Sequence, residues 1–219
     1  MTDDIIHAQY DITKKSKLRA FYESKKKLIF LTTFFIILII GLTVFYINSK
    51  KEKKILLSEN YVTAKIYLEN GNKEKSKSIL REIVFANDAT YSTLAFFLIL
   101  NQELIDDERE LIVLFDHILK NNNFDQEIQN LLIYKKAVFA SNFITESELL
   151  NDIKPLLKKG TLWKPHALLL LGDYFSNKSE YIKAKEFYGQ VLQIKNLKQS
   201  LYDQAIIKLS QIDSKTYDN

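Results

Sequence analysis

The sequence contains no cysteine, two prolines and five glycines among its 219 residues. Disulfide-stapled scaffolds and thiolate metal sites need cysteine, and collagen-like or low-complexity chains need far more proline or glycine. So few helix-breaking residues, with a hydrophobic fraction of 47%, favour long helices over the many tight turns of a β-sandwich or barrel. We therefore predict an all-α chain.

Signals of catalysis are scarce as well. The three histidines, His7, His117 and His166, lie far apart in the chain, so no pair has the spacing of metal ligands. The sequence has no G-x-S-x-G motif, no P-loop and no glycine-rich dinucleotide turn. We expect no catalytic residue, no metal site, no cofactor and no small-molecule substrate.

The net charge of +4 comes mostly from the first 27 residues, which hold seven basic and four acidic side chains. An uncharged segment follows, and the rest of the chain carries 24 basic and 23 acidic side chains. Such a balanced region has no long-range field with which to attract phosphates. We expect no nucleic-acid partner, and we assign residues 1–27 to a basic tail.

Residues 28–47 read LIFLTTFFIILIIGLTVFYI, in which fifteen residues are Leu, Ile, Phe or Val and none is charged. A helix of this length rises about 30 Å, the hydrocarbon thickness of a bilayer. A buried core helix would normally show a polar stripe, and a cleavable signal peptide would be shorter and followed by a small-x-small site. We predict a transmembrane signal anchor over 28–47, followed by a juxtamembrane linker over 48–54.

The charges beside this segment predict its orientation. Seven Lys or Arg residues lie within the fourteen residues before it, against four lysines soon after it, Lys50, Lys51, Lys53 and Lys54. By the positive-inside rule the N-terminus is cytoplasmic and the C-terminal domain lies outside, as in a type II protein. The lack of cysteine is compatible with an oxidising compartment.

Residues 55–219 alternate between amphipathic segments and short polar breaks, which predicts nine helices. Leu168, Leu171, Gly172 and Phe175 resemble the W-x2-L-G-x2-Y part of the first helix of a tetratricopeptide repeat. In the second helix, Ala184 and Tyr188 match A-x3-F. The small Gly172 and Ala184 let the paired helices approach, and Tyr188 fills the space around them.

Earlier units are degenerate but keep this register. Ala64, Ile99 and Ala137 precede Gly172 with spacings of 35, 38 and 35 residues. Twelve residues after each of these four positions come Ser76, Leu111, Leu149 and Ala184. Nineteen residues after each come Ile83, Ile118, Leu156 and Val191. We predict a tetratricopeptide-like solenoid of about four helix pairs.

Two details of this solenoid are predicted separately. A final capping helix presents Leu201, Ile206, Leu209 and Ile212 to the array and has a polar back. Pro155 lies inside the predicted second helix of the third unit, so it must bend that helix or shift its start.

The resemblance to tetratricopeptide arrays implies a groove, lined by the first helices, that binds peptides or proteins. The residues expected to face it are Tyr61, Phe96, Tyr134 and Leu169, and one turn further on Lys65, Leu100, Val138 and Asp173. An aromatic strip of this kind suits an extended or partly unfolded chain, unless the neighbouring helix or the cap covers it. Trp163 is expected to pack at the joint between units, and His166 to be a surface or capping residue.

The order of these parts resembles the bacterial ancillary subunit of the SecYEG translocon, a single-pass inner-membrane protein with a periplasmic tetratricopeptide domain. The resemblance implies a non-enzymatic protein near the translocon that contacts translocon subunits, periplasmic chaperones or emerging polypeptides. An envelope scaffold for cell division or outer-membrane assembly is the alternative. An enzyme is a third hypothesis, and it would need ionisable groups that converge in a closed pocket.

Overall fold

The computed structural model describes residues 17–158 and 160–217, and in these ranges the chain forms nine helices and no strand. The prediction of an all-α chain is therefore confirmed. The first sixteen residues of the predicted basic tail, with His7, lie outside the described residues. The helices are α1 (Lys17–Glu69), α2 (Lys73–Val84), α3 (Tyr91–Asn101), α4 (Glu108–Asn121), α5 (Gln126–Ala140), α6 (Glu146–Ile153), α7 (Lys164–Asn177), α8 (Tyr181–Leu192) and α9 (Gln199–Tyr217).

The chain divides into two units, Met1–Leu56 and Leu57–Asn219, and each is described by itself. In the first unit α1 contains the apolar segment 28–47, whose most apolar stretch has a mean hydropathy of 2.8 and no buried part. Among the described residues it is the one helix long and apolar enough to cross a membrane. A core helix of a soluble domain would be mostly buried, so the exposure of this stretch favours a membrane span. Residues 48–54, predicted as a linker, are also helical.

Three threonines interrupt the apolar segment without requiring water. The hydroxyl groups of Thr32 and Thr33 donate to the Ile29 carbonyl at 2.9 and 2.8 Å, and Thr43 donates to the Ile39 carbonyl at 2.7 Å. These bonds satisfy the hydroxyl donors within the helix. The segment is therefore compatible with a lipid environment, where an unsatisfied polar group is costly.

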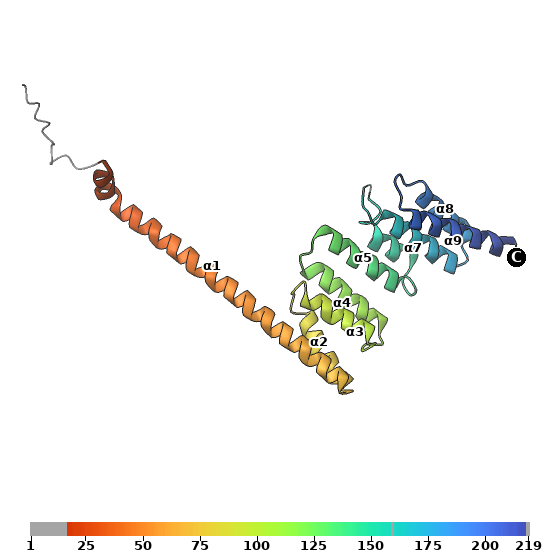
Figure 1. The fold of residues 1–219 in the computed structure, drawn as a ribbon, viewed down its shortest axis with the longest axis horizontal. Coiled ribbons are helices and arrows are strands. Elements are labelled where there is room, and N and C mark those ends of the chain that lie inside the picture. The colour runs from red at the N-terminus through yellow and green to blue at the C-terminus, as the bar shows by residue number, and fades with distance from the viewer. Residues whose placement is uncertain (1–16, 159, 218–219) are drawn as a thin grey trace, which may run out of the picture. The chain divides into compact units, whose positions relative to one another are not determined.

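The second unit is a series of antiparallel helix pairs that begins with the end of α1 and α2 (Figure 1). Within the series α2 packs against α3, α3 against α4, α4 against α5 and α5 against α6, while α7 packs against α8 and α8 against α9. In addition α5 contacts α7, and α7 contacts α9. Helices α5 and α7, which are the first helices of the last two pairs, and the final helix α9 therefore lie side by side, as in a helical-repeat array.

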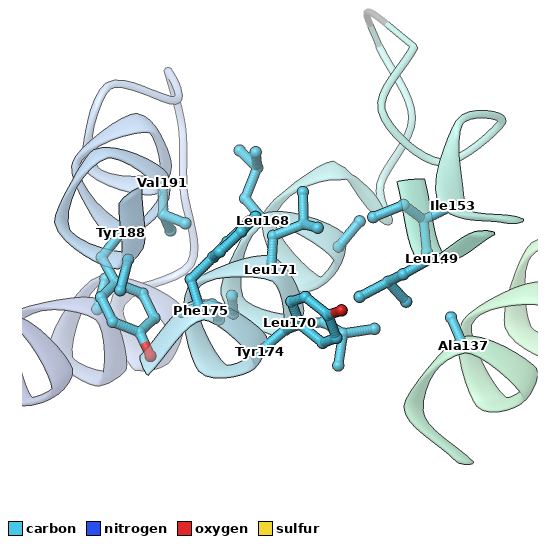
Figure 2. Close-up of a cluster of buried hydrophobic side chains, with 14 of the residues drawn as sticks. Ala137, Leu149, Ile153, Leu168, Leu170, Leu171, Tyr174, Phe175, Tyr188 and Val191 are labelled. Carbon is cyan, nitrogen blue, oxygen red and sulfur yellow. The ribbon is translucent and has the colours of Figure 1, made fainter. Parts of the chain in front are cut away.

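The register found in the sequence coincides with the core. Ala64, Ile99, Ala137 and Gly172 are buried, and so are the eight residues that lie twelve and nineteen positions after them. At Gly172 the helices approach so closely that a Cβ atom would overlap the Tyr188 ring. Figure 2 shows Tyr188 and Val191 of α8 beside Leu168, Leu171 and Phe175 of α7.

Several polar breaks end helices through left-handed backbone conformations. Gly71 has a φ of 77°, and Asn87, Ser179 and Asn196 have φ values of 57°, 61° and 57°. These conformations suit glycine and are tolerated by short polar residues, which explains their place at helix ends.

Pro155 does not lie inside a helix, so the prediction that it bends α6 or shifts the start of α6 is wrong. Helix α6 ends at Ile153, and Pro155 follows in the turn after it. Lys154 keeps a helical backbone conformation, but Pro155 has no N–H group to donate to the carbonyl four residues earlier, so the hydrogen bonds of the α-helix stop before it. Leu156 is nevertheless fully buried, because the turn returns it to the core.

The final helix buries a narrower face than predicted. Ile212 and Ala205 are buried and Leu201 and Leu209 are half-buried. Ile206, which was expected to face the array, is 42% exposed. The physical reason is its phase: Ile206 lies about 100° around the helix from the buried Ala205.

Helix α5 joins two hydrophobic clusters. Leu132 belongs to the cluster that begins at Leu57, and Ala137 belongs to the cluster that extends to Ile212. Beside this joint, the buried Lys136 ammonium lies 2.7 Å from Asp116 of α4 and 2.9 Å from Asp152 of α6. Burial disfavours its charge, but the hydrogen bonds to both carboxylates outweigh burial and raise the pKa of Lys136.

Candidate functional site

Two residues of the predicted groove are not available to a ligand. Phe96 is fully buried, with its ring centroid 4.3 Å from that of Phe115 on α4, and Leu169 is 4% exposed within the core of α7. Both helices are apolar around most of their circumference, so residues assigned to an outer face also pack inward. The prediction that these two side chains face an open groove is therefore wrong.

The other predicted groove residues differ in exposure. Lys65 and Val138 are exposed. The half-buried residues are Tyr61, Leu100, Tyr134 and Asp173. Because Phe96 and Leu169 are buried between them, the predicted residues do not form a continuous aromatic strip.

Tyr134 instead belongs to a compact group of three rings, which we call the Trp163 cluster: Tyr134, Trp163 and His166. Ring centroids are 5.5 Å apart for Tyr134 and Trp163, 5.3 Å for Trp163 and His166, and 5.9 Å for Tyr134 and His166. All three side chains are half-buried, and the neighbouring Leu162 is 73% exposed. Trp163 packs at the joint between units, as predicted, but with part of its surface open to solvent.

A hydrogen bond fixes the indole ring of Trp163 across the joint. Its Nε1–H group donates to a carboxylate oxygen of Glu127 at 2.9 Å. Glu127 lies in the first turn of α5, whereas Trp163 immediately precedes α7. The bond therefore joins two successive helix pairs of the repeat array and leaves the faces of the indole free for packing.

Burial influences the ionisable members of the cluster. It lowers the pKa of His166, and the charge of Lys198 acts in the same direction. Burial raises the pKa of the Tyr134 hydroxyl, and the negative charge of Asp173 raises it further. Both side chains are therefore neutral at pH 7 and present an uncharged aromatic surface.

A second group, the Asp173 cluster, consists of Asp173, Tyr188 and Lys208. One carboxylate oxygen of Asp173 accepts hydrogen bonds from the Tyr188 hydroxyl at 2.6 Å and the Lys208 ammonium at 2.5 Å. Burial and then the bond to Asp173 raise the pKa of Tyr188. The cluster lines a polar cavity of about 310 Å³, together with Ser176, Asn177, Gln211 and Ile212.

The two clusters lie on one side of α7. His166 and Asp173 are seven residues apart, close to two full turns, so their side chains share a helix face. The charge of Asp173 also reaches Tyr134. We call the combined area the α7 surface; it is aromatic at its Trp163 end and polar at its Asp173 end.

Of the predicted groove residues, the structure brings Tyr134 and Asp173 to the α7 surface. Trp163, His166, Glu127 and Lys208 were not predicted to belong to a binding surface. The single Trp of the chain, two residues before Pro165 at a helix start, was a usable signal. Lys208 had no such signal, because its contact with Asp173 depends on how α9 packs.

In residues 17–158 and 160–217, no three His, Cys, Asp or Glu side chains are grouped so that they could hold a metal ion. Comparison with known protein families, with curated proteins and with solved structures finds no match for this chain.

Proposed function

We propose that the chain is a single-pass membrane protein whose helical-repeat domain binds extended segments of other polypeptides. The observation that carries the proposal is the Trp163 cluster. In it, rings from two successive helix pairs pack together, yet they stay half-exposed beside the exposed Leu162. Rings of this kind supply contact area at low entropic cost and do not demand one particular sequence.

The binding role is non-enzymatic. Charged side chains of the α7 surface are engaged with one another or with rings: Asp173 with Lys208 and Tyr188, and Glu127 with Trp163. Such contacts hold the surface in shape before a partner arrives, which lowers the cost of ordering it on binding.

We place the protein in the bacterial inner membrane with its N-terminus in the cytoplasm and the repeat domain in the periplasm. The excess of Lys and Arg before the apolar segment supports this orientation. The order of tail, apolar helix and repeat domain supports a position near the SecYEG translocon, where the partners are translocon subunits, periplasmic chaperones or emerging polypeptides.

Photocrosslinking in cells tests this function. A photoreactive residue replaces Leu162, which is 73% exposed beside the Trp163 cluster, or in a control Ile182, which is 79% exposed on α8. We expect position 162, and not position 182, to capture translocon subunits, chaperones or newly exported chains, identified by mass spectrometry. Capture of folded cell-division or outer-membrane assembly factors would instead support the scaffold alternative.

A further inference from the structure

The part of α1 that directly follows the apolar segment carries four lysines within five residues: Lys50, Lys51, Lys53 and Lys54. Successive residues of an α-helix are turned by about 100°, so the four lysines occupy an arc of about 160°. Glu52 points to the opposite side of the helix. All five side chains are exposed. We call the basic side the lysine face.

The lysine at the start of this face is directed back toward the apolar segment. The Lys50 ammonium lies 4.8 Å from the centroid of the Tyr46 ring, one turn earlier. A hydrogen bond with Tyr46 raises the pKa of Lys50, so the side chain stays cationic. Tyrosines at the ends of membrane helices lie at the level of the lipid headgroups. The contact with Tyr46 therefore holds the Lys50 charge at that level.

We propose that the lysine face binds the phosphate groups of anionic phospholipids in the leaflet next to Tyr46. This inference rests on the proposed membrane span. The four lysines rise only about 6 Å along the helix, less than the roughly 10 Å over which a surface charge acts at moderate salt. All four therefore lie within reach of headgroup phosphates, and Glu52 does not stand between them and the lipid.

The lipid contact also accounts for the position of these lysines. In the proposed orientation they are on the outer side of the membrane, where they oppose the positive-inside bias that the seven basic residues before the segment create. A basic cluster that weakens the topology signal needs another role. Binding to headgroups supplies one, because it resists movement of α1 along the membrane normal.

The absence of cysteine makes a direct test possible. Ser49→Cys is labelled with a donor fluorophore, and the full-length chain is reconstituted into phosphatidylcholine vesicles that contain a trace of acceptor-labelled phosphatidylglycerol or acceptor-labelled phosphatidylcholine. We expect phosphatidylglycerol to be enriched about fivefold near the label, the ratio that the attraction of a single lysine gives. In molar salt the enrichment should vanish, because the screening length falls to about 3 Å.

Matched variants assign the effect to the lysine face. Replacement of Lys50, Lys51, Lys53 and Lys54 by Gln should abolish the enrichment. Replacement of four exposed lysines of the repeat domain by Gln makes the same change in net charge and should preserve it; these are Lys73, Lys75, Lys120 and Lys195.

Three outcomes would overturn the inference. Equal transfer to both labelled lipids would reject the lipid site but leave the membrane span intact. Loss of enrichment with inorganic phosphate, beyond that caused by chloride of equal ionic strength, would assign the lysine face to free phosphate. No transfer to either lipid would reject the membrane span, and the lipid site with it.

Discussion

Gly172 and Lys136 show how single residues determine the repeat packing. Gly172 is buried where α7 meets α8, and the Tyr188 ring occupies the volume that a side chain would need. Lys136 is the buried cation that joins α4 and α6 through Asp116 and Asp152. The sequence predicted the role of Gly172 from the repeat motif. It did not predict that of Lys136, because its partners come from two other helices.

Gly172→Ala should destabilise the repeat domain. The new methyl group overlaps the Tyr188 ring, which is 2% exposed and held by Asp173, so the ring cannot move away cheaply. The overlap outweighs the gain in helix propensity, and we expect a net loss of about 1–2 kcal/mol. Denaturant unfolding of the full chain in detergent, followed by Trp163 fluorescence, measures it.

Gly189→Ala is the matched control and should have the opposite sign. Gly189 lies within α8, and a Cβ atom there has no neighbour within 4 Å. Only the propensity gain of about 0.5–1 kcal/mol remains. Equal effects of the two substitutions would contradict the assigned contact between α7 and α8.

Lys136→Met should lower the free energy of unfolding by about 1–3 kcal/mol, because it leaves the Asp152 carboxylate without its cation in a partly buried place. The exposed neighbour Lys135 is the control, and Lys135→Met should change stability by less than about 0.5 kcal/mol. A Lys136→Met protein as stable as the parent would show that the ion pairs do not hold the joint at α5.

At the scale of elements, α6 is the shortest helix of the array, and its start is well defined. The Thr145 hydroxyl accepts from the Glu148 N–H, while the Glu148 carboxylate accepts from the Thr145 N–H at 2.8 Å. The Thr145 N–H and then its hydroxyl group lower the pKa of Glu148. The cap is therefore stronger when Glu148 is ionised.

The stability difference between the parent and Glu148→Ala should depend on pH. A carboxyl group whose pKa is lowered by folding stabilises above its unfolded pKa, and this stabilisation is lost as the pH falls through the folded pKa. The difference between the unfolding midpoints of the two proteins should be largest at pH 7 and should decrease below about pH 4. Glu82→Ala, at an exposed position of α2, should not show this decrease. A constant difference for Glu148→Ala across this range would argue against the cap.

The elements themselves were largely predictable from the sequence, and their faces less so. Asn, Gly and Ser mark several helix ends, and at Gly71, Asn87 and Ser179 the reason is a positive φ, which few other residues adopt. Phe96 and Leu169 were placed on the wrong side because α3 and α7 have apolar residues nearly all around, so periodicity does not define an outer face. The α7 surface depends on contacts across units, which local patterns do not encode.

At the scale of the whole molecule, the proposal requires that the two ends of α1 lie on opposite sides of a membrane. Introduced cysteines test this because the chain has none. In sealed right-side-out vesicles, an impermeant maleimide should label Ser214→Cys at once and Ser24→Cys only after lysis. The reverse pattern would show that the orientation is the opposite one. Labelling of both cysteines without lysis would reject the membrane span.

Trp163 makes possible the most direct test of the proposed binding function, since it is the only Trp in the chain and lies in the α7 surface. An unfolded, Trp-free polypeptide is titrated into the full-length protein while Trp163 emission is recorded. We predict a saturable shift of the emission to shorter wavelength, no shift with the same polypeptide when folded, and an affinity about fivefold to tenfold weaker for Tyr134→Ala. Tyr61→Ala should bind like the parent. Absence of a saturable shift, or unchanged affinity in Tyr134→Ala, would contradict polypeptide binding at this surface.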